Sequence, residues 1–246
     1  MIRILALTVF LFGFAGWAQA RPVTVFAAAS LRDALSEIAR SFPQEVTLSF
    51  AGSGTLARQI AAGAPVDAVV LAHADWADWL AERDVLLAGS RVDVAGGALV
   101  LVGRKGSPDL PVVDGPGLMA LLGPRGRLAI GQRDAVPAGS YARAWLQHAG
   151  LWETLVPRLA ETDNVRAALA LVAQGAAPLG VVYAADAAAE PRVDVLYRVP
   201  ASAHPPIRYP AAALTEEGRD FVAFLRSPEA EAIFAQFGFA APADGP

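Results

Sequence analysis

The sequence predicts an α/β protein of two lobes, each a mostly parallel sheet flanked by helices. Short apolar runs alternate with helical patterns from Arg21 onward, which is typical of α/β proteins. The alternation occurs in two similar halves, connected by segments near residues 97–103 and 200–206. We therefore expect two hinge crossings, with residues 21–100 and 204–246 in the first lobe and 101–203 in the second.

The first twenty residues have the pattern of a signal peptide. Arg3 supplies a positive charge, residues 4–15 are an apolar run, and Ala18-Gln19-Ala20 is a small-x-small cleavage site. The apolar run is too short to span a bilayer. We expect cleavage after Ala20 and export of the mature chain to the periplasm.

The first half of the mature chain predicts strands at residues 23–26, 46–50 and 66–71. Ser30 is placed to cap the first helix, whose apolar residues recur at helical spacing. Residues 52–55 open a second helix that ends at Gly63, and a third helix covers 74–80. After an extended run at 98–102, the loop 103–116 is rich in glycine and proline, and we interpret it as a crossing between the lobes.

The second half repeats the pattern. Strands are expected at residues 128–130, 179–182, 193–199 and 207–214. Val136-Pro137-Ala138-Gly139 opens a helix that ends at Gly150, and Asn164 caps one that ends at Gly175. Two more helices follow the last strand, and the final one begins at Ser227-Pro228.

Charge and composition exclude several kinds of partner. The 246 residues include 20 basic and 24 acidic side chains, a net charge of −4, whereas nucleic-acid binders carry a concentrated basic face. There is no cysteine, and His73, His148 and His204 are too far apart for a helical histidine pair. We expect no cofactor and no metal held directly by protein ligands.

Glycine-rich turns raise the alternative of nucleotide chemistry. The sequence has neither a Gly-x-Ser-x-Gly elbow nor a P-loop lysine. The segment from Gly52 to Ala57 does match the loose dinucleotide pattern after a strand, although Asp67 is too near and Asp75 only approximately placed for the ribose acid. A nucleotide-dependent enzyme that uses this turn stays open as the alternative from another function class.

Four strand-to-helix junctions are built from small residues, which are neutral apart from Asp163. They are 27–30, 52–55, 136–139 and 163–165. A helix N-terminus presents free backbone N–H groups and about half a positive charge, so it binds anions without a basic side chain. Ser30 and Ser53 would add hydroxyl donors. Ordinary helix capping is the alternative for each junction taken alone.

These junctions carry a resemblance to a known family. The chain resembles the periplasmic molybdate-binding proteins of ABC transporters across essentially the whole mature length, with all motifs in family order. The matching stretches are Val23–Leu31, Phe50–Ile60, Gly63–Asp67, Val136–Gly139, Asn164–Val172 and Ala177–Tyr183. The resemblance implies a two-lobed periplasmic binding protein fold of type II, and it implies capture of molybdate, and also of tungstate, for an ABC permease.

The resemblance also implies the site. It places serine hydroxyls of Ser30 and Ser53, main-chain N–H groups of Ala138 and Val165, and the Tyr183 phenol around the oxyanion. Molybdenum would then be held through its oxygens and not by protein ligands. None of the five residues is acidic, which suits a dianion that only accepts hydrogen bonds. A receptor for another tetrahedral oxyanion such as sulfate is the alternative within this class.

The resemblance further implies a protein that is not an enzyme, and we expect it to be a monomer. Four arginines follow the implied contacts by one to five residues: Arg32, Arg58, Arg143 and Arg166. We interpret them as solvated helix faces, with steering of an anion toward the cleft as the alternative.

Overall fold

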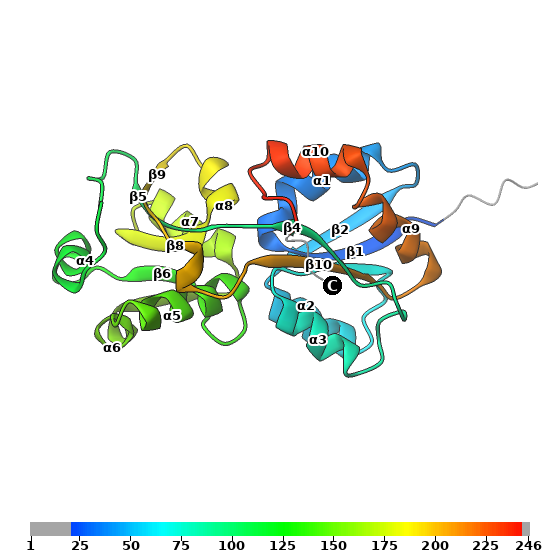
Figure 1. Cartoon of the computed structure of the whole chain (residues 1–246), viewed down its shortest axis with the longest axis horizontal. Helices are drawn as coiled ribbons and strands as arrows, with labels where there is room; N and C mark the ends of the chain where they lie inside the picture. Colours follow the sequence, from blue (N-terminus) through cyan, green and yellow to red (C-terminus); the bar gives the residue numbers. More distant parts are fainter. Residues whose placement is uncertain (1–20, 243–246) are drawn as a thin grey trace, which may run out of the picture.

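The computed structural model describes residues 21–242 as two lobes, each built on a five-stranded sheet (Figure 1). The expected signal peptide lies outside the described residues. Within residues 21–242, no helix combines the length and apolar character needed to cross a membrane.

The first lobe contains the sheet β2-β1-β3-β10-β4. Its strands are β1 (Val23–Ala28), β2 (Val46–Ala51), β3 (Ala68–Val70), β4 (Val92–Gly96) and β10 (Arg208–Ala213). One face of the sheet is covered by α1 (Arg32–Ser41), α9 (Glu216–Phe224) and α10 (Pro228–Gln236), and the other by α2 (Ser53–Ala61) and α3 (Ala74–Ala81) (Figure 1).

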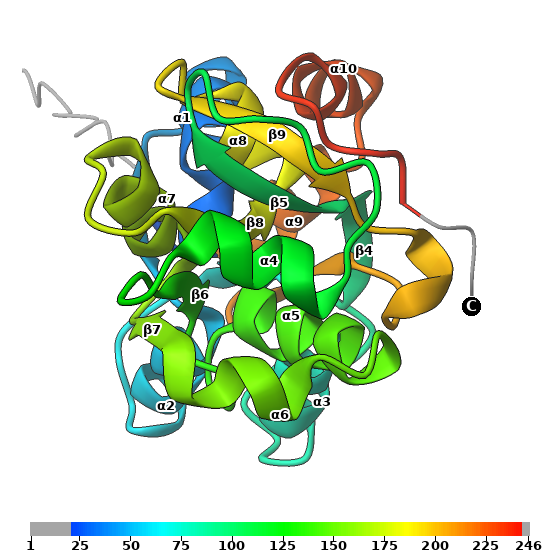
Figure 2. The same cartoon turned by 90° about the vertical axis from the view of Figure 1, so that its left-hand side faces the viewer.

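The second lobe contains the sheet β7-β6-β8-β5-β9, whose strands follow one another from bottom to top in Figure 2. They are β5 (Leu99–Arg104), β6 (Leu128–Gly131), β7 (Leu159–Thr162), β8 (Leu179–Tyr183) and β9 (Val193–Arg198). The helices are α4 (Gly115–Leu122), α5 (Pro137–His148), α6 (Trp152–Leu155), α7 (Val165–Ala173) and α8 (Ala184–Ala188). Three 3-10 turns complete the chain: η1 (Ala29–Leu31), η2 (Val156–Arg158) and η3 (Ala201–Ala203).

Both sheets are mixed, and each contains one strand that runs antiparallel to both of its neighbours. β10 runs antiparallel to β3 and β4, and β5 runs antiparallel to β8 and β9, whereas the other pairs are parallel. β5 and β10 are the two strands that arrive from the other lobe. The α/β prediction is confirmed, and the carboxyl ends of the parallel strands are where such folds bind ligands.

The chain crosses from one lobe to the other at two places. The first is Gly97–Ala98, between β4 and β5, and the second is the segment between β9 and β10. The expected boundary after residue 100 falls inside β5, because that strand belongs wholly to the second sheet. The interpretation of 103–116 as a crossing is wrong, since both β5 and α4 lie in the second lobe.

The same loop hides a helix that composition did not predict. Asp114 caps α4 by accepting a hydrogen bond from the Gly117 N–H at 2.7 Å, and Pro116 stands in the first turn. Proline is compatible with that position because the N–H it lacks has no helical partner there. Strands β4 and β7 and the short helices α6 and α8 were also not predicted.

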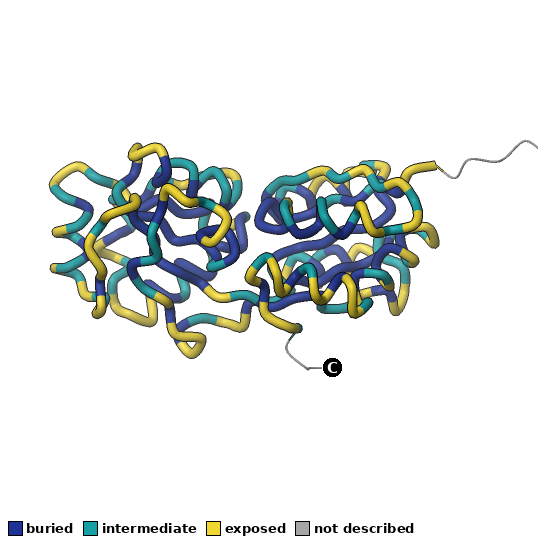
Figure 3. The backbone as a smooth tube through the Cα atoms, turned by 90° about the horizontal axis from the view of Figure 1, so that it is seen from above, coloured by how far each residue is buried: buried dark blue, intermediate teal, exposed yellow. Residues whose placement is uncertain are grey.

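Buried strands form the interior of both lobes, and exposed residues lie on outer loops and helix faces (Figure 3). One apolar cluster continues from β1 and α1 of the first lobe to β6 and β8 of the second. Within the first lobe, beside the first crossing, Ala240 and Gly96 exchange two backbone hydrogen bonds of 2.8 and 3.0 Å. The crossings are therefore anchored in packed structure.

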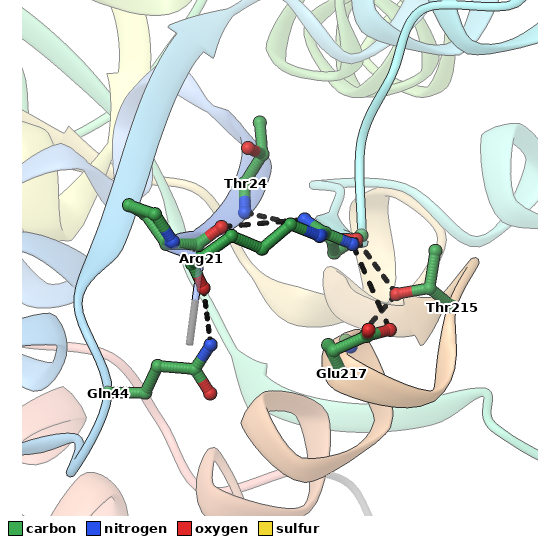
Figure 4. A network of polar contacts seen from close by, with 8 residues as sticks. Arg21, Thr24, Gln44, Thr215 and Glu217 are labelled. Atoms are coloured by element: carbon green, nitrogen blue, oxygen red, sulfur yellow. Dashed lines mark hydrogen bonds and ion pairs between the residues drawn. The ribbon is translucent and has the colours of Figure 1, made fainter. Parts of the chain in front are cut away.

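Figure 4 shows a network of polar contacts at the start of the described chain that includes Arg21, Thr24 and Thr215. These three residues bond to one buried carboxylate, that of Asp67. Asp67, 2% exposed, accepts two hydrogen bonds of 2.7 Å from Arg21, one of 2.8 Å from the Thr24 N–H and one of 2.8 Å from the Thr215 hydroxyl. The Arg21 guanidinium lowers the pKa of Asp67 to about 2, while burial opposes the shift. This carboxylate therefore joins the beginning of β1 to the loop before α9.

Asp67 should make the stability of the protein depend on pH. Its folded-state pKa of about 2 lies below the unfolded value near 3.9, so the stabilisation is complete above pH about 4 and is lost as pH falls toward 2. We expect Asp67→Asn to remove about 2 kcal/mol of this pH-dependent stability, measured by urea unfolding between pH 5 and 2. Asp109→Asn, on an exposed loop, is the control. Identical pH profiles for wild type and Asp67→Asn would contradict the assignment.

Candidate functional site

A small cavity lies between the lobes, at the carboxyl ends of the parallel strands. Its volume, taken as the space open to the centre of a water-sized sphere, is about 10 Å³. All five residues predicted for the site line it, together with small and apolar neighbours: Ala28, Ala29, Ser30, Ala51, Gly52, Ser53, Ala72, Val136, Pro137, Ala138, Asn164, Val165 and Tyr183. Residues that lie far apart in the sequence thus meet around one space.

Each predicted residue follows a strand of one of the sheets. Ser30 is in η1 after β1, and Ser53 is the first residue of α2 after β2. Ala138 and Val165 are in the first turns of α5 and α7, where backbone N–H groups have no helical partner. Tyr183 ends β8. All five are at most 4% exposed, so little of the surface that they contribute to the lining is open to solvent.

Two buried hydroxyls at the cavity have no hydrogen-bond partner among the described residues, those of Ser30 and Tyr183. A buried polar group without a partner is costly, so its persistence calls for a ligand or a water. Burial raises the pKa of Tyr183 well above 10, and neighbouring Tyr209, Tyr141 and Asp186 add to the rise. The phenol therefore stays protonated and can donate a hydrogen bond.

The capping predictions for Ser30 and Asn164 have opposite outcomes. Ser30 does not cap α1, because it lies inside η1 and no side chain bonds to the start of that helix. Asn164 does cap α7, accepting a hydrogen bond from the Ala167 N–H at 3.0 Å. The Ser30 hydroxyl is thus not used as a helix cap.

Ser53 lines the cavity and also makes a hydrogen bond within the protein. Its fully buried Oγ accepts a hydrogen bond from the Ala72 N–H at 3.1 Å. The hydroxyl proton remains available to a second partner, because a serine can accept and donate at once. Ser53 therefore couples the cavity to the end of β3.

We expect Ser53→Ala to destabilise the ligand-free protein by about 1–3 kcal/mol, because the buried Ala72 N–H would lose its acceptor. Thermal or urea unfolding without ligand measures the change. Ser30→Ala is the matched control. The Ser30 hydroxyl has no hydrogen-bond partner that would be left unsatisfied, so this substitution should leave the stability unchanged. Equal stability of the two variants would contradict the proposed bond.

The lobes meet closely at two glycines of the first lobe. A Cβ at Gly52 would lie 2.4 Å from the carbonyl oxygen of Asp163, in the second lobe. The Gly54 N–H donates to the Ala135 carbonyl across the interface at 3.1 Å. The absence of a side chain at these positions allows the backbones to touch, which the sequence pattern alone did not reveal.

A family model described as bacterial extracellular solute-binding protein matches residues 23–240. The chain belongs to this family. It is 42% identical over 229 residues to the molybdate-binding protein ModA of Escherichia coli (strain K12), a match that covers 88% of each chain. It is 37% identical over 240 residues to ModA of Haemophilus influenzae, covering 93% of each.

Solved structures agree with this membership. The Azotobacter vinelandii periplasmic molybdate-binding protein matches with a TM-score of 0.77 and 28% identity, over 90% of this chain and all of the other. The sulfate-binding protein SubI of Mycobacterium tuberculosis matches with a TM-score of 0.70 at 19% identity, over 92% and 88% of the two chains. The second similarity concerns the fold alone.

The cavity of this solute-binding protein has no charged residue in its lining. Arg32 and Arg58 are exposed, as predicted, over the rings of Phe50 and Trp76. Arg143 pairs with Asp134 at 2.7 Å outside the cavity. The solvated-face prediction is wrong for Arg166, whose side chain is only 25% exposed and forms ion pairs with two aspartates.

The geometry disfavours the nucleotide alternative. Gly52, on the turn that resembles a dinucleotide fingerprint, lies against Asp163. The cavity, about 10 Å³, is far smaller than the roughly 300–1,000 Å³ typical of sites for drug-sized ligands. Among residues 21–242, no group of three or more His, Cys, Asp or Glu side chains could hold a metal ion. A solute-binding protein with this cavity is suited to a small ligand.

Proposed function

We propose that this solute-binding protein captures molybdate, and also tungstate, between its lobes in the periplasm and delivers it to an ABC permease. The observation that carries the proposal is the small, uncharged cavity between the lobes, lined by two unpartnered hydroxyls and by the N-termini of α2, α5 and α7. Relatives named as molybdate-binding proteins, at 42% and 37% identity, support the choice of ligand.

The chemistry of the lining fits a fully ionised tetrahedral oxyanion. Ser30, Ser53 and Tyr183 offer hydroxyl donors, and Ala138 and Val165 offer only their main-chain N–H groups. Hydrogen bonds to a charged partner contribute about 1.5–3 kcal/mol each, and the helix N-termini add favourable electrostatics. Hydrogen phosphate carries a proton that would need an acceptor, and no carboxylate lines the cavity to accept it.

Sulfate is the alternative that this chemistry leaves, since it too only accepts hydrogen bonds. Molybdate is larger, so discrimination depends on how closely the lobes approach. The backbone contacts at Gly52 and Gly54 set that approach.

The remaining features belong to the same proposal. The signal peptide at residues 1–20 is cleaved after Ala20, the mature chain acts as a monomer, and its role is transport without catalysis. Five residues bind the oxyanion, with no cofactor and no direct metal ligand: Ser30, Ser53, Ala138, Val165 and Tyr183. The two lobes move about the crossings at Gly97–Ala98 and between β9 and β10.

Calorimetric titration of the mature protein tests the proposal. We expect saturable heats with molybdate and tungstate at micromolar concentration or below, an increase in melting temperature, and much weaker binding of sulfate and phosphate. Tight binding of sulfate with none of molybdate would favour the alternative ligand. No binding of any tetrahedral oxyanion would overturn the proposal.

A further inference from the structure

Arg166 occupies a position that oxyanion binding by itself does not explain. It follows Val165 on α7, and its Nε donates to the carboxylate of Asp186 on α8. Its Nη2 lies 2.7 Å from Oδ2 of Asp33 on α1. Arg166 does not line the cavity, so it reaches two helices without occupying the ligand space.

The three partners each stand beside a residue of the proposed site. Asp33 is three residues after Ser30, Arg166 is one after Val165, and Asp186 is three after Tyr183. Asp186 is completely buried, and one of its oxygens has no partner among the described residues. Its ionised form therefore depends on Arg166, which fixes α7 and α8 relative to each other.

The contact with Asp33 differs in kind because it crosses between the lobes. Of the ion pairs formed among residues 21–242, only that of Arg166 with Asp33 joins the first lobe to the second. The Asp33 side chain is 39% exposed, so it can exchange this partner for water when the lobes separate. Opening breaks the pair, whereas the bond to Asp186 stays within one lobe.

We propose that Arg166 is a positioning residue that latches the closed state: Asp186 holds it beside Val165 and Tyr183, and its pairing with Asp33 slows release of the oxyanion. This inference rests on the proposed function and extends it to a residue outside the ligand lining. A latch acts on the closed state, so it should change the dissociation rate more than the association rate.

Simple electrostatics predicts an effect of opposite sign. Asp33 is a negative charge near a site for a dianion, so removing it without any latch would strengthen binding through reduced repulsion. A latch predicts that the same removal weakens binding. The direction of the change therefore separates the two explanations.

The experiment compares the wild type with Asp33→Ala and Asp33→Asn. Arg166 is not itself replaced, because its loss would leave Asp186 buried without a cation. The control is Glu37→Gln on the same helix, since Glu37 pairs with Arg40 within that helix. Release of bound molybdate into excess tungstate is followed by stopped-flow tryptophan fluorescence, and ligand-free stability is measured alongside.

We expect Asp33→Ala to release molybdate about three to ten times faster, with association changed less than about twofold and ligand-free stability preserved. Asp33→Asn should fall between, and Glu37→Gln should match the wild type. Unchanged or slower release from Asp33→Ala, in a protein whose wild type binds, would overturn the latch alone. A wild type that binds neither anion would overturn the proposed function and the latch with it.

Discussion

Replacing Gly52 with alanine is expected to weaken molybdate binding by at least about a hundredfold while the ligand-free protein stays folded. The added Cβ would lie 2.4 Å from the Asp163 carbonyl oxygen, and all three of its nearest neighbours belong to the second lobe. Gly52 has φ −67° and ψ 140°, which alanine adopts freely. The clash therefore exists only when the lobes close. Lobes that cannot close fully would leave the oxyanion without one or two of its charge-assisted hydrogen bonds. That loss accounts for the expected drop in affinity of about a hundredfold.

Calorimetry gives the affinity of this variant, and small-angle scattering with and without molybdate shows whether the lobes still close. Gly115→Ala is the matched control. Gly115 lies on the outer helix α4, and a Cβ there would have as its nearest neighbour a leucine methyl at an ordinary contact distance of 3.5 Å. Gly54 is less suitable, since a Cβ there would also meet Trp76 of its own lobe at 2.6 Å. Wild-type affinity in Gly52→Ala would show that the observed closure is not the binding state.

Tyr183→Phe and Ser30→Ala should each weaken oxyanion binding by about ten- to a hundredfold and leave the ligand-free protein as stable as the wild type, or slightly more so. Each change deletes a buried hydroxyl that has no partner among residues 21–242. A hydrogen bond to a charged partner is worth about 1.5–3 kcal/mol, whereas an unpartnered buried hydroxyl contributes nothing favourable. The two quantities are measured by calorimetry and by urea unfolding.

Tyr197→Phe is the control for the phenol, because Tyr197 lies on β9 outside the cavity lining. Tyr197→Phe should change the affinity by less than about twofold and leave the stability of the ligand-free protein unchanged. If Tyr183→Phe lowered stability and kept its affinity, the hydroxyl would have a structural role and the assignment of the site would fail.

Much of the fold was predictable because its elements obey local rules. Strands β1, β2, β6 and β8 are short, largely apolar runs, and helices α5, α7 and α10 begin and end with recognisable residues. Gly63, Gly150, Gly175 and Gly238 end helices with positive φ, the conformation that favours glycine. The elements that were missed lack such signals: β4 is a half-buried strand, and α4 begins in a segment rich in glycine and proline.

The five site residues were named through a resemblance, and from the residues themselves only the separate junctions were visible. Whether a serine caps a helix or faces a cavity depends on the backbone around it, as Ser30 shows by lying in a 3-10 turn instead of preceding α1. No sequence spacing relates Arg166 to Asp33 across 133 residues. Such pairs come from the way two sheets are brought together.

The sequence by itself determined that this is an α/β chain with four strand-to-helix junctions built mainly from small, uncharged residues and with no cysteine for thiol chemistry. Hydrophobic periodicity, glycine and capping act over a few residues, so they can be found without a fold. Only the tertiary structure decided that the junctions meet in one small, uncharged cavity, that Gly52 sets how closely the lobes approach, and that Arg166 joins them. Those features depend on distances between segments far apart in the chain, which local preferences do not encode.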